Sequence, residues 1–233
     1  MRQTPRAIVS TSLALAAVGS VLLASPVQAA TPSASSSVQS EAKALRIYDE
    51  LNSAENSAAA YEALSAAERS AFDSYFLPAR NEETVRLTPL DENARMAAQT
   101  GHVSTTYSSI QAAEDDVSSI LGCWGTWAKN TQWAAAGNAI FDTFTEGTWC
   151  ANGSTVTSAT FNRSWSSIAA VGWRDAGQVG RGSGVVGNRA KIWAQRKLIL
   201  GVGGWDVQTQ LPCTRLIGTA AASASGDRSC SIY

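Results

Sequence analysis

Apolar residues recur at intervals of three and four in the first part of the chain, a spacing typical of amphipathic helices. The first such stripe consists of Val38, Ala42, Leu45, Tyr48 and Leu51. A second helix is expected after Ser65-Ala66-Ala67-Glu68, where the serine hydroxyl and the glutamate carboxylate form a capping box. A third stripe covers residues 110–121, and Gly122 follows it as a C-terminal cap. We therefore expect a helical region at residues 38–122, after a flexible Ser-rich leader at residues 30–37.

The pattern changes to that of antiparallel strands from residue 123 onward. Segments 123–133 and 140–150 flank a short turn rich in Ala and Gly. When they are paired about the midpoint of that turn, three pairs of residues lie opposite each other: Cys123 and Cys150, Trp124 and Trp149, and Trp133 and Ile140. Directly opposite residues have nearly the Cβ separation that a disulfide requires. The turn and the cysteines therefore favour the same register.

The four cysteines are an even set, so two disulfides are expected in a secreted chain. The hairpin register favours Cys123–Cys150, which leaves Cys213–Cys230 as the second bridge. No spacing resembles C-x-x-C, and the chain contains a single His. We therefore expect a disulfide framework and no metal site.

Turn signals predict further strands. Asn152-Gly153 is the strongest hairpin signal in the chain and predicts a strand that starts at residue 155. Further strands are expected around residues 166–174, 189–200, 205–211 and 213–219, although the composition of 189–200 also suits a helix. The expected fold is α+β: an N-terminal helical segment followed, at residues 123–233, by an antiparallel β-sandwich or barrel with two disulfides.

Charge divides the chain at the same place. Residues 30–122 contain 6 Lys and Arg against 14 Asp and Glu, whereas residues 123–233 contain 10 against 5. We expect the acidic helical region to dock on the basic β domain, because its apolar stripes must be buried somewhere. The cations available for such docking are Arg163, Arg174, Arg189 and Lys191. The docked region is interpreted either as a pro-region or lid, or as a permanent layer of one domain.

Residues 1–29 have the features of a signal peptide. Arg2 and Arg6 precede a mostly apolar run, and Val27-Gln28-Ala29 supplies small residues at the cleavage site. Ser, Thr and Gly interrupt the run, and no later stretch approaches the roughly 18 apolar residues of a membrane span. We therefore expect a secreted, extracellular protein without membrane insertion.

Composition argues against several functional classes. The chain is 45% hydrophobic and 16% charged, so it can bury a core. Its net charge of −1 argues against a nucleic-acid binder. Residues 182–187 match G-x-G-x-x-G, but the preceding segment does not resemble the buried strand that a dinucleotide site needs. We interpret these residues as a loop between strands and expect no cofactor.

The tryptophans provide the leading functional hypothesis, because all eight lie after residue 122. On one face of the expected hairpin, charged residues such as Asp142 lie among three aromatic ones: Trp127, Trp133 and Phe144. The opposite face carries no charge, and its aromatic residues are Trp124, Phe141 and Trp149. The uncharged face is expected to be the inner one. The mixed face is then a candidate platform for a cell-envelope polysaccharide or a secreted protein partner.

Two alternatives remain open. A secreted hydrolase requires two carboxyl groups about 5–9.5 Å apart, and Asp175 and Asp206 are candidates that would converge from different strands. A secreted inhibitor or toxin would instead present a disulfide-braced loop to a protein. Two carboxyl groups in one cleft would favour the hydrolase, whereas exposed and roughly coplanar aromatic rings would favour the binding protein.

Several short motifs resemble a pattern in secreted actinobacterial proteins with a Trp-rich β domain. The motifs are Cys123-Trp124, the run Trp149-Cys150-Ala151-Asn152-Gly153-Ser154-Thr155-Val156-Thr157, and Gly172-Trp173. The resemblance covers roughly residues 120–215 and leaves out the helical half. It implies secretion and a small β domain, and it carries no established activity.

The mature protein is expected to start near Ala30 and to contain no free thiol. Intact-mass measurement before and after treatment with an alkylating agent, without reduction, should give the same mass. An alkylated product would show that at least one cysteine is unpaired.

Overall fold

The computed structural model describes residues 34–89 and 121–233. In this part of the chain, three helices precede nine strands that form two antiparallel sheets. The helices are α1 (Ala34–Ser53), α2 (Ser57–Glu62) and α3 (Ala66–Phe76). Sheet A contains β1 (Pro78–Pro89), β2 (Leu121–Ala134), β3 (Ala139–Asn152) and β4 (Thr155–Ile168). Sheet B contains β5 (Trp173–Val186), β6 (Arg189–Val202), β8 (Cys213–Gly218) and β9 (Ala224–Asp227), with β7 (Trp205–Gln210) paired to β6.

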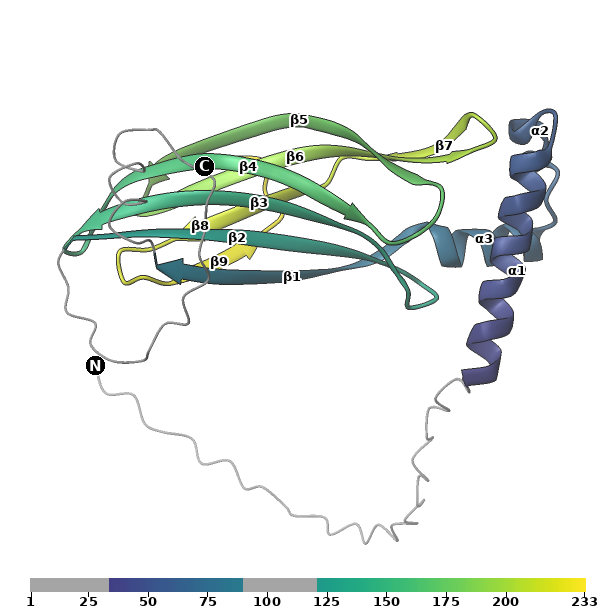
Figure 1. Cartoon of the computed structure of the whole chain (residues 1–233), viewed down its shortest axis with the longest axis horizontal. Coiled ribbons are helices and arrows are strands. Elements are labelled where there is room, and N and C mark those ends of the chain that lie inside the picture. Colours follow the sequence, from purple (N-terminus) through teal and green to yellow (C-terminus); the bar gives the residue numbers. More distant parts are fainter. Residues whose placement is uncertain (1–33, 90–120) are drawn as a thin grey trace, which may run out of the picture. The chain divides into compact units, whose positions relative to one another are not determined.

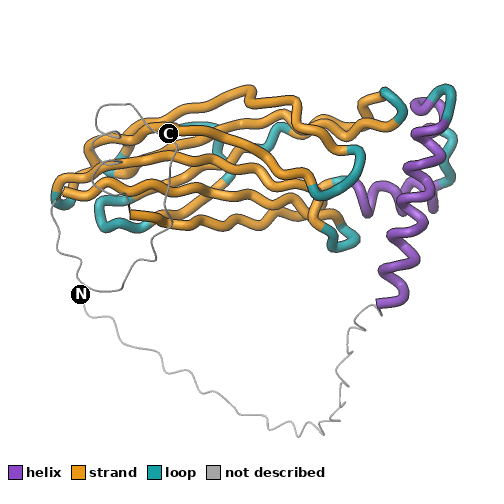
Figure 2. Tube along the Cα trace, viewed as in Figure 1, coloured by secondary structure: helices purple, strands orange, loops and turns teal. Residues whose placement is uncertain are grey.

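The two sheets pack face to face as a sandwich (Figures 1 and 2). The fold confirms the expected α+β class, with an N-terminal helical segment followed by antiparallel sheets. Both expected disulfides are present, Cys123–Cys150 within sheet A and Cys213–Cys230 between β8 and the C-terminal tail. Two structural disulfides fit an oxidising compartment.

The register of the β2–β3 hairpin agrees with the sequence over most of its length. Cys123 lies opposite Cys150, and Trp124 lies opposite Trp149. The register shifts beyond Gln132, so that Trp133 faces Ala139 instead of Ile140. At this irregularity the side chain of Ile140 lies in the core and is fully buried. Regular alternation along the strand would have placed it on the mixed face, with Asp142 and Phe144. A bulge of this kind leaves no mark in the pattern of apolar residues.

The expectation of a helical region throughout residues 38–122 is wrong in two places. Residues Pro78–Pro89 form strand β1, and Leu121 and Gly122 begin strand β2 instead of ending a helix. β1 is an edge strand of sheet A, and Arg80 and Glu82 occupy alternate positions in it. Charged residues protect an edge strand from pairing with other chains, and here they mask the apolar alternation by which a strand is recognised.

The other boundaries differ less. Helix α1 begins at Ala34, within the segment expected to be a flexible leader. The expected signal peptide and most of the third expected helix fall in residues 1–33 and 90–120, outside the described part of the chain.

The β4–β5 connection also differs from the sequence interpretation. β4 starts at Thr155, as the Asn-Gly signal predicts. β4 ends at Ile168 and β5 begins at Trp173, so the turn between them falls within residues 166–174, which were expected to form a strand. Gly172 in this turn has a φ of 84°, a conformation that residues with a side chain rarely adopt. The ambiguous segment 189–200 is a strand, β6.

Two apolar clusters fill the interior. The first lies at the helical end and packs Phe72 and Phe76 of α3 against Trp173, Leu198 and Leu200 of sheet B. The second lies farther along the sandwich and is built from Ala128, Trp149, Val156, Ala190, Ile192 and Leu216. Trp149 and Phe141 are both almost completely buried, which confirms that the uncharged face of the hairpin is the inner one.

A polar seam joins the inner faces of the two sheets. The hydroxyls of Thr143 on β3 and Thr214 on β8 lie 2.8 Å apart, and the Thr145 hydroxyl donates to the Thr214 carbonyl over 2.9 Å. Asn130, which is 1% exposed, donates its amide to the Cys213 carbonyl. Buried polar groups that satisfy one another in this way fix how the sheets align, because a displacement would leave them unpaired.

The helices dock on the β sandwich through apolar contact and hydrogen bonds. The Trp173 indole N–H donates to the Phe76 carbonyl over 2.9 Å, and the Gly203 N–H donates to Asn52 Oδ1 over 2.8 Å. Of the cations expected to attract the acidic half, Arg163 and Arg174 pair with carboxylates of the β domain itself. Within the described residues, Arg228–Glu83 is the one ion pair between the two halves, and Glu83 belongs to β1.

Phe76→Ala should lower the free energy of unfolding by about 3–5 kcal/mol, because it opens a cavity in the cluster that joins helices and sheets. Val38→Ala is the matched control at an exposed position of α1 and should change stability by less than about 0.5 kcal/mol. Urea denaturation followed by tryptophan fluorescence measures both. A loss below about 1 kcal/mol for Phe76→Ala would show that the helices are a detachable lid.

Candidate functional site

The outer face of sheet A carries three aromatic side chains on three neighbouring strands. Trp127 lies on β2, Phe144 on β3 and Trp165 on β4. Phe144 is directly opposite Trp165 across the β3–β4 pair, and Trp127 is one diagonal step away on β2. Because successive side chains of a strand alternate between faces, all three project from the same side. We call these residues, with the ion pairs beside them, the sheet A cluster.

The three rings pack against one another. The Phe144 and Trp165 rings stack face to face, with centroids 4.7 Å apart and planes 3° apart. Trp127 meets Phe144 edge-on, with centroids 5.6 Å apart and an interplanar angle of 70°. The guanidinium of Arg163 lies 4.8 Å from the centroid of the Trp165 ring. Phe144 and Trp165 therefore use their ring faces on each other and present mainly their edges outward.

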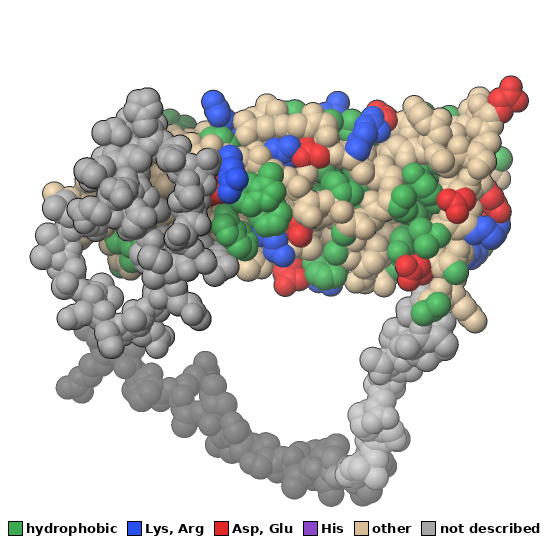
Figure 3. Space-filling view, viewed as in Figure 1, with side chains coloured by type: hydrophobic (Ala, Val, Ile, Leu, Met, Phe, Trp, Pro, Cys, Tyr) green, Lys and Arg blue, Asp and Glu red, His purple; other side chains and the backbone are tan. Residues whose placement is uncertain are grey.

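Ion pairs flank the rings on both sides. Arg163 donates from Nε to Glu146 Oε2 over 2.6 Å, and Glu146 is only 5% exposed. On the other side, Lys129 Nζ lies 3.9 Å from Asp142 Oδ1, which also accepts a 2.6 Å hydrogen bond from the Thr131 hydroxyl. Each cation thus has a carboxylate within reach, which offsets part of the desolvation cost of a half-buried charge. Figure 3, with sheet A toward the viewer, shows hydrophobic side chains interleaved with charged ones.

The structure brings together three of the four predicted binding residues. Trp127, Phe144 and Asp142 belong to the sheet A cluster, whereas Trp133 lies farther along β2, beyond Lys129 and Thr131. The Trp133 ring is covered by the Arg80 guanidinium, 4.5 Å from its centroid. Its indole nitrogen is buried, and no hydrogen-bond partner for it exists among the described residues.

Sequence reasoning did not assign Trp165 to the site, and it gave Arg163 only a role in docking the acidic region. A symmetric pairing about Asn152-Gly153 is the signal that would have found them, since both face the hairpin strand β3. Counting from the turn puts Trp165 opposite Asp142 and Arg163 opposite Phe144. The two one-residue register shifts of β3–β4 change these partners to Phe144 and Glu146 but keep both residues on the same face.

The carboxylates of the hydrolase alternative are not brought together. Asp175 on β5 points between the sheets, where Arg196 Nη2 lies 2.5 Å from its Oδ2 and the Ser166 hydroxyl also donates to it. Asp206 on β7 instead pairs with Arg174 over 2.7 Å. Arg174 and Asp175 are consecutive in β5, so their side chains project from opposite faces of sheet B. Asp206, which pairs with Arg174, therefore lies on the face opposite to Asp175.

The network around Asp175 connects the edges of the two sheets. Arg196 donates from Nη1 to the Ser164 carbonyl of β4 over 2.9 Å. Burial is the largest influence on the pKa of Asp175 and raises it, but hydrogen bonds from Ser166, Arg196 and the Gly177 N–H, together with the Arg196 charge, outweigh it. The pKa of this carboxyl therefore lies below its ordinary value of 3.8.

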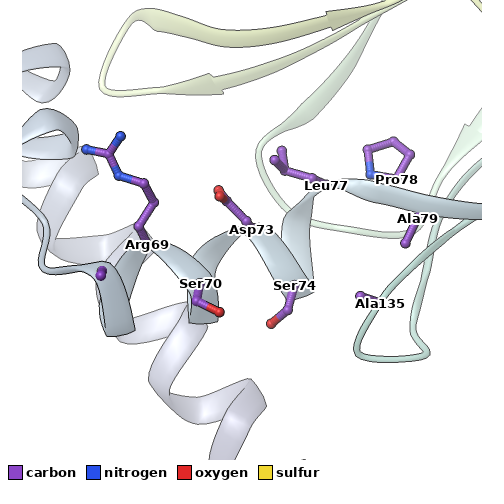
Figure 4. Close-up of a pocket in the computed structure, with 9 residues that line it drawn as sticks. Arg69, Ser70, Asp73, Ser74, Leu77, Pro78, Ala79 and Ala135 are labelled. Atoms are coloured by element: carbon purple, nitrogen blue, oxygen red, sulfur yellow. The ribbon is translucent and has the colours of Figure 1, made fainter.

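A surface hollow lies where α3 meets β1 and the β2–β3 turn (Figure 4). Arg69 and Asp73 project from one side of α3, and Ser70 and Ser74 project from the other. Asp73 accepts a hydrogen bond from the Tyr61 hydroxyl, and Arg69 donates to the Tyr61 carbonyl. These polar groups serve helix packing, and the arrangement does not aim a nucleophile and a base at one point.

The glycine motif at residues 182–187 is not a phosphate-binding loop. It forms the end of β5 and the turn into β6, so the expectation of a loop is corrected and the helix of a dinucleotide site is replaced by a strand. Among the described residues, no group of three potential metal ligands occurs. No helix in the described part of the chain has the length and apolar character needed to cross a membrane.

Asp175→Asn should lower the free energy of unfolding at pH 7 by about 1–3 kcal/mol, because charge-assisted hydrogen bonds to Arg196 are lost. A carboxyl whose folded pKa is depressed stabilises the protein above its unfolded pKa, and this contribution is lost as the pH falls through the folded pKa. The wild type should therefore lose more stability than the variant between pH 5 and pH 2, at roughly the range where Asp titrates.

Urea denaturation across this pH range measures the difference. Asp206→Asn is the matched control, since both partners of its ion pair are about half exposed and such a pair contributes about 0–1 kcal/mol. Equal losses in the two variants would contradict the structural role assigned to Asp175.

No family model matches this chain, and no curated protein or solved structure matches it either. The resemblance to actinobacterial Trp-rich β domains therefore remains an expectation from short motifs. A functional proposal has to rest on the geometry of the described residues alone.

Proposed function

We propose that this chain is a secreted interaction protein that contacts a protein partner through the sheet A cluster. The observation that carries the proposal is the half-buried group of Trp127, Phe144 and Trp165 on the outer face of a sheet, framed by ion pairs. Trp, Phe and Arg are enriched at the centres of protein interfaces, where surrounding polar residues exclude water. The two disulfides and the signal-like N-terminal segment support a secreted location.

The ring geometry favours a protein over a polysaccharide at this face. A sugar that stacks on an aromatic residue needs an accessible ring face. Here Phe144 and Trp165 cover each other, and Arg163 lies against the Trp165 ring. Ring edges and ion pairs instead suit the side chains and backbone of a protein surface, which can supply both apolar contact and complementary charge.

A hydrolase is the second candidate, and it receives less support. Asp175 and Asp206 lie on opposite faces of sheet B, and each is bound by an arginine. The inhibitor or toxin alternative is a special case of the proposed function, because its partner is also a protein.

Trp165→Ala should weaken partner binding by at least 30-fold, the effect of losing about 2 kcal/mol at a hot spot. The mature chain, immobilised, is used to capture proteins from the culture medium of the source organism, and the captured protein is then titrated in purified form. Val179→Ala, at an exposed position of β5 in the other sheet, is the matched control and should bind like the wild type.

Circular dichroism and urea denaturation show whether Trp165→Ala is folded. Lys129→Ala provides a second probe that leaves the stacked rings in place, and it should weaken binding less than Trp165→Ala. Binding that is equal in wild type and Trp165→Ala would rule out the sheet A cluster as the contact surface. Retention of an insoluble polysaccharide that Trp165→Ala abolishes would replace the protein partner by a glycan.

A further inference from the structure

Residues 228–233 cross the outer face of sheet B after strand β9 ends. This C-terminal tail contains no helix or strand, and β9 and β5 stand at opposite ends of the strand order of the sheet. A Cβ atom at Gly184 of β5 would lie 3.2 Å from Cδ1 of Ile232. The C-terminal tail therefore passes over β8 and β6 and reaches the opposite edge of the sheet.

A disulfide and several side-chain hydrogen bonds anchor the C-terminal tail to the strands beneath it. Cys230 is bonded to Cys213, the first residue of β8. The Cys230 Sγ accepts a 3.5 Å hydrogen bond from Gln195 Nε2 of β6. The Ser231 carbonyl accepts a 2.6 Å hydrogen bond from Arg215 Nη1 of β8. Among these contacts, the disulfide is the one covalent anchor.

The remaining contacts of the tail bury little apolar surface. Ile232 is half-buried, and Tyr233 is 86% exposed. The Arg228–Glu83 ion pair joins side chains that are 56% and 33% exposed, and such a pair contributes little to stability. A segment with few buried apolar contacts opens locally at a low cost in free energy. The position of the tail therefore depends mainly on its disulfide.

The two disulfides of the protein differ in their accessibility to a thiol. Cys123 and Cys150 are 4% and 5% exposed, and they lie opposite each other in the ladder between β2 and β3. Cys213 is 4% exposed, but its partner Cys230 lies in the tail and is exposed. A thiolate exchanges with a disulfide only where it reaches one of the two sulfurs. Residue exposure thus singles out the tail disulfide, with attack at Cys230.

We propose that Cys213–Cys230 is a site of thiol–disulfide exchange, at which a dithiol releases the C-terminal tail from the outer face of sheet B. One thiolate of the dithiol attacks the Cys230 Sγ, so that the bond to Cys213 breaks and Cys213 leaves as a thiolate, which takes a proton from water. The second thiol of the reductant then displaces Cys230 from the mixed disulfide. The protein gains two electrons and two protons, and the dithiol becomes a disulfide.

Release of the tail changes the outer face of sheet B and leaves the core intact. Arg215 and Gly184, which the tail contacts, lie directly opposite Trp193 and Lys191 of β6. The surroundings of these two residues therefore change when the tail leaves. Neither apolar core cluster contains a residue of the tail, so the sandwich stays folded. This redox-sensitive element does not depend on the proposed protein partner of the sheet A cluster.

The rate at which each disulfide is reduced tests the exchange step. The oxidised mature protein is incubated with dithiothreitol without denaturant, treated with iodoacetamide at intervals and mapped by peptide mass. Cys213 and Cys230 should be alkylated at least about tenfold faster than Cys123 and Cys150, while circular dichroism stays unchanged. Glutathione, a monothiol, should form its mixed disulfide with Cys230 and not with Cys213.

Tryptic cleavage after Arg228 tests the release of the tail, because a protease needs a segment that can extend into its active site. Cleavage should be at least about tenfold faster in the selectively reduced and alkylated protein than in the oxidised protein. The double variant C213S/C230S should be cleaved at the fast rate without any reductant. The matched control is C123A/C150A, which lacks the other disulfide and should be cleaved at the slow rate.

A purely structural bridge predicts different results. Equal rates of reduction for the two disulfides, or reduction only after denaturant is added, would overturn the proposal. A glutathione adduct on Cys213 would overturn the assignment of Cys230 as the sulfur attacked. An unchanged rate of cleavage after selective reduction would show that hydrogen bonds hold the tail without the disulfide. The measurements on the wild-type protein decide the outcome if either double variant is not folded.

Discussion

The whole arrangement depends on covering the apolar end of the β sandwich. Trp173, Leu198, Leu200 and Val202 line the interior of sheet B at that end. Phe72 and Phe76 of α3 fill this position, and the Trp173 indole N–H donates to the Phe76 carbonyl. The three helices are therefore an integral part of the core. Carboxylates of the described helices such as Glu41, Glu50 and Glu62 are exposed, and among the described residues Arg228–Glu83 is the one ion pair between the two halves.

Once this end is closed, the hairpin register decides which surfaces the molecule offers. The Cys123–Cys150 pair sets the alignment of β3 with β2, and the polar seam of Thr143, Thr145 and Thr214 sets its alignment with sheet B. The same alignment puts Phe144 and Glu146 on the outside, beside Trp165 and Arg163. A shift by one residue would bury these charges and expose Trp149. On the outer face of sheet A, Trp127, Phe144 and Trp165 pack together, whereas on sheet B the Trp193 ring lies over Gly180 and Gly182.

Local features of the fold were predictable from the sequence, and long-range ones were not. The hairpin register followed from a short turn and two cysteines, and the inner face followed from the absence of charge. β1 was missed because its pairing partner, β2, follows more than 30 residues later and its own charges hide the alternation. Trp165 was missed because β4 was not paired with the hairpin. Counting from the turn places it on the correct face, although the two register shifts of β3–β4 change its partner from Asp142 to Phe144.

The network that joins β4 to β5 and β6 has a consequence for how the protein behaves at high concentration. Sheets A and B each end in a long edge strand, and unpaired edges are templates for the growth of fibrils. Arg196 bonds the Ser164 carbonyl, Asp175 accepts from Ser166, and Ser164 donates to Gln178 over 2.8 Å. Side chains of this network occupy the space that an incoming strand would need. The Asp175–Arg196 network therefore hinders the pairing of another strand with the long, glycine-rich edge strand β5, and so protects the protein against amyloid-like aggregation.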